Sequence, residues 1–224
     1  MHRRTAITSV GSHTLIALSG CVDARWFPSD DGTSEVERFT LVVGEPSDVP
    51  ADAPVTDATE ATLVEVADVR AAIAEAVAAD GAIARTISDD AIDEVRERLM
   101  ELPDHRETGY PAGQYVHYEE SVVVIFGYAG SEGELTGEPI ETVPPDGTAI
   151  DRDDPRVEGV EPIQLTIESV LEGMGTATVA VADDELAAAA TGLHLLPVYA
   201  GNAEFPSGYY VRADEDVIVL RLMI

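Results

Sequence analysis

The sequence predicts an α+β protein made of two tandem duplicated domains. Residues 110–125 (YPAGQYVHYEESVVVI) and 205–220 (FPSGYYVRADEDVIVL) share seven of sixteen residues, where unrelated segments would share about one. Ahead of each repeat, apolar residues at helical spacing alternate with short β-branched runs. Each copy has the predicted order β-α-β-α-β-β with a C-terminal hairpin, over 39–129 and 130–224. The alternative is a single sandwich in which both copies share one sheet.

Local signals define the elements of the first copy. They are strands at 39–43 and 62–66, a helix at 69–79, a strand at 82–87 and a helix at 89–102. Asp68 is the expected cap of the first helix, because a short acidic side chain accepts hydrogen bonds from free backbone N–H groups. Gly81 is its expected stop.

The second copy repeats this order. Its expected elements are a strand at 156–160, a helix at 162–172, a strand at 176–182 and a helix at 183–196. Pro162 suits the first position of a helix, where no N–H is needed. The segment AGSEGELTG, residues 129–137, is rich in glycine and is expected to be a flexible join between the copies.

Each copy closes on a hairpin. In the first copy the expected strands are 115–118 and 122–126, and Pro111 and Gly113 form a turn just before them. The bend between the strands contains Glu119 and Glu120. Tight two-residue turns prefer Asn or Gly, so a longer bend is expected.

The charge of the chain restricts its solvent and its partners. The 224 residues include 43 acidic residues against 13 basic ones, all of them arginine, and the net charge is −30. A nucleic acid would be repelled, so it is excluded as a partner. Such a charge destabilises a compact fold unless salt screens it. Salt at 1 M does so, because the Debye length is then only ~3 Å. A disordered acidic chain is the alternative, and a hydrophobic content of 45% argues against it.

The N-terminus resembles an export signal. Arg3 and Arg4 precede a mildly apolar stretch that ends in Leu18-Ser19-Gly20-Cys21. These four residues resemble the lipobox of bacterial and archaeal surface lipoproteins, and the start resembles a twin-arginine signal. The resemblance implies that residues 1–20 are removed, that Cys21 carries lipid, and that the protein lies on the extracellular face of the cytoplasmic membrane. The alternative is a cytosolic protein with a misassigned start and a lone buried cysteine.

An acidic tether is expected to follow the anchor, over residues 21–38. It contains SDDGTSEVE and little that packs, apart from Trp26 and Phe27, which lie either at the membrane interface or on the first domain. Because Cys21 is the only cysteine, disulfides and thiolate metal sites are excluded. Together, the lipobox, the absence of lysine and the repeated hairpin resemble the small haloarchaeal surface lipoproteins of unknown function. This resemblance implies location and fold class but no activity.

No catalytic residue and no cofactor are predicted. The sequence lacks the HExxH, GxSxG and EF-hand patterns. The three histidines beyond the signal peptide, His105, His117 and His194, are not repeated in the other copy, so each is expected to be structurally satisfied or solvent-facing. The nearest approach to a cation site is a loop with three carboxylates, where chance clustering is the competing explanation in so acidic a chain: Asp151, Asp153 and Asp154.

The copies differ most in their second helix. Residues 92–102 read IDEVRERLMEL, whereas 186–196 read LAAAATGLHLL, so a charged face has become an alanine face. Small residues allow close approach and tyrosines supply contact area. The sequence therefore predicts a buried contact, made either with the first copy or with a partner, by these residues: Ala187, Ala188, Ala190, Tyr199 and Tyr209.

Two classes of function agree with these observations. The first is a non-enzymatic binding or interaction module, anchored by its lipid and contacting a protein or a component of the cell envelope. The second is a hydrolase or a solute-binding component with its site between the two copies. A deep pocket between the copies, lined by polar groups, would favour the second class.

Overall fold

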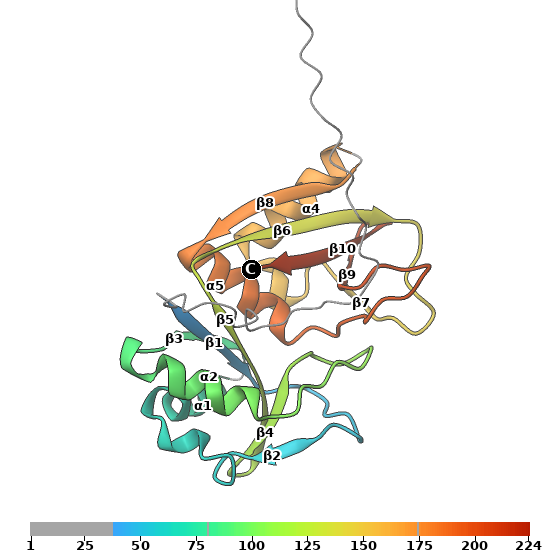
Figure 1. Cartoon of the computed structure of the whole chain (residues 1–224). Coiled ribbons are helices and arrows are strands. Elements are labelled where there is room, and N and C mark those ends of the chain that lie inside the picture. Colours follow the sequence, from blue (N-terminus) through green and yellow to red (C-terminus); the bar gives the residue numbers. More distant parts are fainter. Residues whose placement is uncertain (1–37, 80, 174) are drawn as a thin grey trace, which may run out of the picture.

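A computed structural model of the chain describes residues 38–79, 81–173 and 175–224. The signal peptide, the lipobox with Cys21 and all of the tether up to residue 37 lie outside the described residues. The described part is a mixed α+β structure with two five-stranded sheets and five α-helices (Figure 1). None of these helices is both long enough and apolar enough to cross a membrane.

The first sheet is formed by strands between residues 39 and 129. These are β1 (Phe39–Gly44), β2 (Val55–Asp57), β3 (Ile83–Thr86), β4 (Gln114–Tyr118) and β5 (Ser121–Ala129). Their order across the sheet is β2-β4-β5-β1-β3, and every pair is antiparallel except β2 with β4. β1 is buried along its whole length, because the sheet is covered on both faces.

Two helices cover one face of this sheet. α1 (Ala67–Ala79) packs on β1, β3 and β5, and α2 (Ile92–Met100) packs on β5. Apolar residues at helical spacing, among them Val69 and Ile73, point into a core shared with alternate residues of the strands such as Leu41. Two short 3₁₀ segments precede the helices, η1 (Leu63–Glu65) and η2 (Asp89–Ala91).

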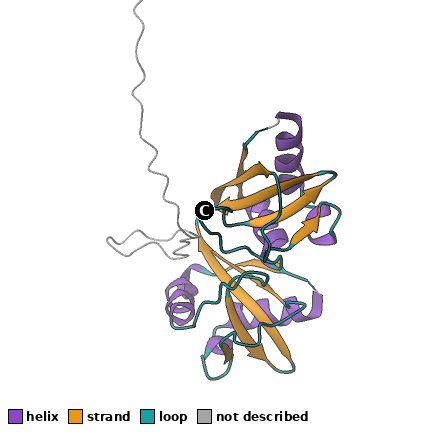
Figure 2. Ribbon diagram, turned by 90° about the vertical axis from the view of Figure 1, so that its right-hand side faces the viewer, coloured by secondary structure: helices purple, strands orange, loops and turns teal. Residues whose placement is uncertain are grey.

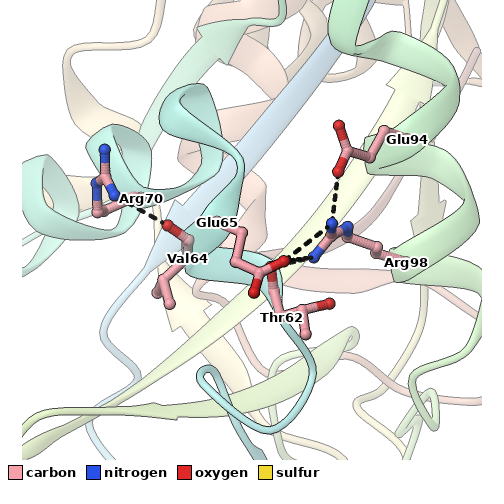
Figure 3. Close-up of polar contacts among 6 residues, drawn as sticks. All are labelled: Thr62, Val64, Glu65, Arg70, Glu94 and Arg98. Atoms are coloured by element: carbon pink, nitrogen blue, oxygen red, sulfur yellow. Dashed lines mark hydrogen bonds and ion pairs between the residues drawn. The ribbon is translucent and has the colours of Figure 1, made fainter.

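Arg98 of α2 links this helix to η1 through hydrogen bonds and ion pairs. Its guanidinium donates to the backbone oxygen of Thr62, lies 3.3 Å from the carboxylate of Glu65 and lies 2.5 Å from that of Glu94 on its own helix (Figure 3). The planar fork of arginine serves several acceptors at once, which a lysine ammonium does less well. Nearby, Arg70 of α1 donates to the backbone oxygen of Val64.

The second sheet is formed by strands between residues 132 and 223. These are β6 (Glu132–Ile140), β7 (Ala149–Asp151), β8 (Ala177–Ala182), β9 (Tyr209–Ala213) and β10 (Asp216–Met223). Their order is β7-β9-β10-β6-β8, again with one parallel pair, β7 with β9. The helices of this half are α3 (Pro155–Glu158), α4 (Glu161–Gly173) and α5 (Asp183–His194). Figure 2 shows the two halves, each with its own sheet and helices.

Residues of the repeated motif make matching contacts in the two halves. The hydroxyl of Tyr115 donates to the backbone oxygen of Pro111 at 2.8 Å, and that of Tyr210 donates to Pro206 at 2.6 Å. Both tyrosines are buried. A buried phenol needs a partner for its hydroxyl, so this bond explains why both copies have tyrosine four residues after proline.

The glycine of the motif is required by close backbone contact. Gly113 has a φ of 147°, and a Cβ atom there would lie 2.7 Å from the oxygen of Ile125. At Gly208 the φ is 144°, and a Cβ atom would lie 2.6 Å from the oxygen of Leu220. Any side chain would push the neighbouring strand away, so both copies have glycine here.

α5 lies between the two sheets. It packs on β6 and β8 of its own half and also on β1 and β3 of the first half. Ala190 and Leu193 belong to the same buried cluster as Val42 and Phe126 of the first sheet. The second face of the first sheet is therefore covered by the second half of the chain, and the two halves share a core (Figure 1).

Two expected strands are wrong. The stretch 62–66 contains the 3₁₀ turn η1, and most of 156–160 belongs to α3. The helix α3 begins there because the side chain of Asp154 accepts a hydrogen bond from the N–H of Arg156, while Pro155 needs no partner at the first position. The short strands β2 and β7, which lie in Pro-rich stretches, were not predicted.

The expected flexible join at 129–137 is also wrong. Most of it forms β6, which pairs with β8 on one side and β10 on the other. Its glycines make room for packing: a Cβ atom at Gly133 would lie 2.7 Å from the oxygen of Met223, and one at Gly137 would lie 2.9 Å from methyl groups of Thr166 and Val170. A composition typical of linkers here reflects a crowded central strand.

Two smaller expectations are corrected. Asp68 lies inside α1 and does not cap it; its carboxylate accepts from the N–H and hydroxyl of Ser88, at 3.0 and 2.6 Å, just before the second helix. The hairpin has a two-residue turn, since Tyr118 pairs with Ser121. Glu119 adopts a φ of 54°, so it takes the left-handed conformation that glycine or asparagine more often supplies.

Candidate functional sites

The three carboxylates predicted as a weak cation site line a surface hollow of about 430 Å³. The lining residues are Asp151, Arg152, Asp153, Asp154, Arg212 and Asp214. Arginines lie among the carboxylates, so the lining of the hollow carries both positive and negative charges. A cation here would compete with guanidinium groups for the same oxygens.

The carboxylate oxygens of Asp154 already accept hydrogen bonds from other groups of the protein. Its carboxylate accepts from the backbone N–H of Arg156 at 3.0 Å and from the Arg156 guanidinium at 2.8 and 2.7 Å. These bonds hold the pKa of Asp154 below its ordinary value. Asp153, by contrast, is exposed and lies 3.9 Å from Arg152. The loop is organised as an ion-paired helix start, which does not support a cation site.

A second hollow, of about 110 Å³, lies between the two halves. Its polar lining residues include Thr40 and Thr86 from the first sheet, Ser131 from the loop between β5 and β6, and Asp184 from α5. Arg38 of the first half and Asp183 of the second form an ion pair at its edge. Pockets that enclose small-molecule ligands usually measure ~300–1,000 Å³, so this one is too small for such a ligand.

The alanine residues of α5 divide between the interior and the surface. Ala190 is buried in the core shared by the two halves, and Ala187 is half-buried and lines the hollow between them. Ala188 is exposed, so it takes no part in the predicted buried contact. Fewer alanines than the run of four therefore approach the first half, because successive side chains of an α-helix point in directions ~100° apart.

The two tyrosines lie in different surroundings. Tyr199 is buried within its own half, with its ring edge-on to Tyr210 at 5.6 Å, and its hydroxyl accepts from Asn202 at 2.7 Å. Tyr209 is half-buried, and burial raises its pKa to about 12, with Arg106 of the first half acting in the opposite direction. Tyr209 also packs against the buried cluster that the two halves share.

Loops of the two halves also bond directly. The N–H of Val198 donates to the oxygen of Tyr110 at 3.1 Å, and the N–H of Gly109 donates to the oxygen of Val198 at 2.9 Å. The hydroxyl of Thr108 accepts from the N–H of Ala200 at 3.2 Å. These bonds continue the contact of α5, so the described interaction candidates other than Ala188 are engaged within the chain.

Two of the three histidines have ordinary structural roles. His194 is buried, and its Nε2 donates to the backbone oxygen of Val124 at 2.8 Å, because a carbonyl only accepts. Burial lowers its pKa to about 4, so it is neutral at pH 7. His117 is exposed, and its Nδ1 lies 3.7 Å from the carboxylate of Asp57.

His105 does not fit the expectation of a satisfied or solvent-facing side chain. It is buried, yet its Nε2 atom has no hydrogen-bond partner among the described residues. Asp52 and Glu107 place carboxylate oxygens near it, and the three ligand atoms all lie within 4.8 Å of one another. The sequence gives no sign of this group, because Asp52 is more than fifty residues away from the other two.

Comparison of the chain with protein-family models, with curated proteins and with solved structures finds no significant match in any of the three.

Proposed function

We propose that this chain is a lipid-anchored surface protein that works as a non-enzymatic binding or interaction module on the extracellular face of the cytoplasmic membrane. The observation that carries the proposal is the sequence Leu18-Ser19-Gly20-Cys21, which follows an arginine-containing start and ends in the only cysteine. A lipid on Cys21 provides the membrane contact, and a protein or a component of the cell envelope is the partner.

We further propose that the module arose by internal duplication. The repeated hairpin sequence supports this, and so does the strand order, in which β6 to β10 take the places of β1 to β5. Each half places a tyrosine-to-proline hydrogen bond and a crowded glycine at the same point. Two α+β units joined through α5 would present a broad, rigid surface at the end of the tether.

The proposed setting is a halophilic cell with molar salt. No aspartate, glutamate or arginine of the described part of the chain is fully buried, so its charge is spread over the surface. With the first twenty residues removed, Arg3 and Arg4 are lost and the net charge becomes −32. A surface of this kind keeps a protein soluble in salt that screens its self-repulsion.

A binding module agrees better with the space between the halves than a solute-binding component or a hydrolase does. The hollow there is about 110 Å³ in volume, and the Arg38–Asp183 ion pair lies along it. A solute of ordinary size would have to separate the two halves and break the core around Ala190. Binding at an outer surface needs no such movement.

Replacement of Cys21 tests the anchor in the cell. Cys21→Ala should release the protein from washed membranes into the soluble or secreted fraction, because the thiol that takes the lipid is missing. Ser29→Ala, in the tether, is the matched control and should stay with the membranes. If Cys21→Ala stays on washed membranes as firmly as the control, the proposal of a lipid anchor is wrong.

A further inference from the structure

We propose that Asp52, His105 and Glu107 form a binding site for a divalent metal ion of the zinc class. The site lies entirely in the first half, away from the hollow between the halves. It goes beyond the proposed function, which assigns no metal to this chain.

Two loops bring the three side chains together. Asp52 lies between β1 and β2, whereas His105 and Glu107 lie between α2 and β4. The loop around His105 is fixed by a pair of backbone hydrogen bonds with Gly113, at 2.9 and 3.0 Å. These two bonds hold the backbone of His105 in place beside Gly113.

The unpartnered nitrogen of His105 points to a ligand. The residue is 9% exposed, and its Nε2 has no hydrogen-bond partner among the described residues. Buried polar atoms are nearly always satisfied, and an ion is one of the few explanations for an exception. The nearest carboxylate oxygen, on Glu107, lies 3.7 Å away, which is too far for a hydrogen bond.

The separations suit a shared ion. Metal–nitrogen and metal–oxygen bonds to Zn²⁺ are ~2.0–2.2 Å long. Two ligand atoms 3.7 Å apart, such as His105 Nε2 and Glu107 Oε2, can both reach an ion placed between them. Asp52 and Glu107 are exposed, so their side chains can move to close the gap that remains, since all three ligand atoms lie within 4.8 Å of one another.

The second half shows that the fold does not require histidine at this position. Tyr199 pairs with Gly208 through its backbone as His105 pairs with Gly113. Its ring lies edge-on to Tyr210 at 5.6 Å, where the ring of His105 lies edge-on to Tyr115 at 5.5 Å. An aromatic ring fills both places, but the tyrosine hydroxyl is bonded to Asn202, whereas the imidazole Nε2 has no partner among residues that the structure describes.

The donor set selects the kind of ion. One imidazole nitrogen with two carboxylates suits Zn²⁺ and other divalent ions of the first transition row, such as Mn²⁺ and Co²⁺, whereas Ca²⁺ and Mg²⁺ prefer oxygen ligands alone. Three protein ligands leave at least one coordination position for water or a further ligand. The site would thus be open to solvent on the side of its two exposed carboxylates.

Calorimetric titration of the purified chain with Zn²⁺ tests the proposal. Molar KCl and an excess of Mg²⁺ suppress loose binding to the acidic surface. We expect one tight Zn²⁺ per chain, with affinity reduced at least ~10-fold in His105→Tyr, a loss that even supporting residues of metal sites produce. This variant installs the residue of the second half, so the fold should tolerate it. His117→Tyr, which alters an exposed histidine, is the matched control and should bind as the wild type does.

Asp52→Asn and Glu107→Gln provide a second test at exposed positions where folding is not at risk. Both should weaken Zn²⁺ binding while leaving the far-UV spectrum and thermal midpoint in place. The proposal is overturned if the wild-type chain binds no stoichiometric Zn²⁺, if His105→Tyr binds as tightly as the wild type, or if His117→Tyr loses as much affinity as His105→Tyr.

Discussion

At the scale of single residues, burial and partners give three histidines three different roles. His117 is exposed beside Asp57, His194 is buried and bonded to Val124, and His105 is buried with no hydrogen-bond partner for its Nε2 in the described part of the chain. Their side chains are chemically the same, so only the surroundings distinguish them. The surroundings of His194 couple folding to pH, because burial disfavours the charged imidazolium and the ring therefore takes up a proton more readily in the unfolded chain.

The exchange His194→Gln should remove part of the acid sensitivity of the fold. In the folded state the pKa of His194 is about 4, whereas an unfolded histidine titrates at ~6.5. Between these values the unfolded chain binds more protons, so this contribution to stability is complete above pH 6.5 and is lost as the pH falls toward 4. Glutamine can donate to Val124 without titrating.

Urea unfolding at pH 7.5 and pH 4.5 in molar salt measures this effect. Between the two pH values the wild type should lose ~2 kcal/mol more unfolding free energy than His194→Gln, at about 1.4 kcal/mol for each unit of pKa difference. Equal losses in the two proteins would show that His194 is not held neutral by burial.

At the scale of elements, α5 decides how the halves are joined. After its acidic first turn α5 contains no Asp, Glu or Arg, because it packs on β6 and β8 on one side and on β1 and β3 on the other. The corresponding helix of the first half, α2, faces a core on one side only and is charged elsewhere. Small residues on α5 let the first sheet approach closely.

Substitutions two residues apart on α5 should therefore differ sharply. Ala190→Leu adds three carbons in a core that includes Val42 and Phe126, and overpacking of this kind typically costs ~1–3 kcal/mol. Ala188→Leu adds the same atoms at an exposed position and should change stability by less than ~0.5 kcal/mol. Denaturant unfolding of both variants gives the comparison, and equal effects would contradict the placement of α5 between the sheets.

Elements with a regular pattern could be predicted from the sequence, and elements shaped by crowding could not. The helices α1, α2, α4 and α5 and the strand β1 follow from the spacing of their apolar residues. β6 was missed because Gly133 and Gly137, which admit close neighbours, have the composition of a linker. The clustered carboxylates Asp151, Asp153 and Asp154 are visible in the sequence, but the sequence does not show that Arg156 binds Asp154. By contrast, Asp52 and His105 meet only through folding.

At the scale of the whole molecule, one buried core joins two sheets under a strongly acidic surface. The shared cluster around α5 predicts that the halves unfold together, since neither can lose the contact alone without exposing apolar residues. The charge of −30 opposes this compact state at all times. Screening by salt therefore decides whether the stabilisation by the buried core outweighs the repulsion between the surface charges.

Dilution of salt should unfold the protein. From molar salt to ~0.1 M the Debye length grows from ~3 to ~10 Å, so carboxylates that hardly interact begin to repel one another over the whole surface. The expected result is a falling thermal midpoint and finally loss of the far-UV helical signal. Restoring molar salt should restore both. A spectrum and midpoint indifferent to the dilution would contradict the proposed halophilic setting.

The mass of the N-terminal peptide of the mature protein tests whether the protein is anchored by a lipid. Trypsin cleaves after Arg25, so we expect a peptide of residues 21–25 that begins at Cys21 and carries the additional mass of a lipid. A mature protein that begins at Met1 or at another residue, or a Cys21 with an unmodified thiol, would contradict it.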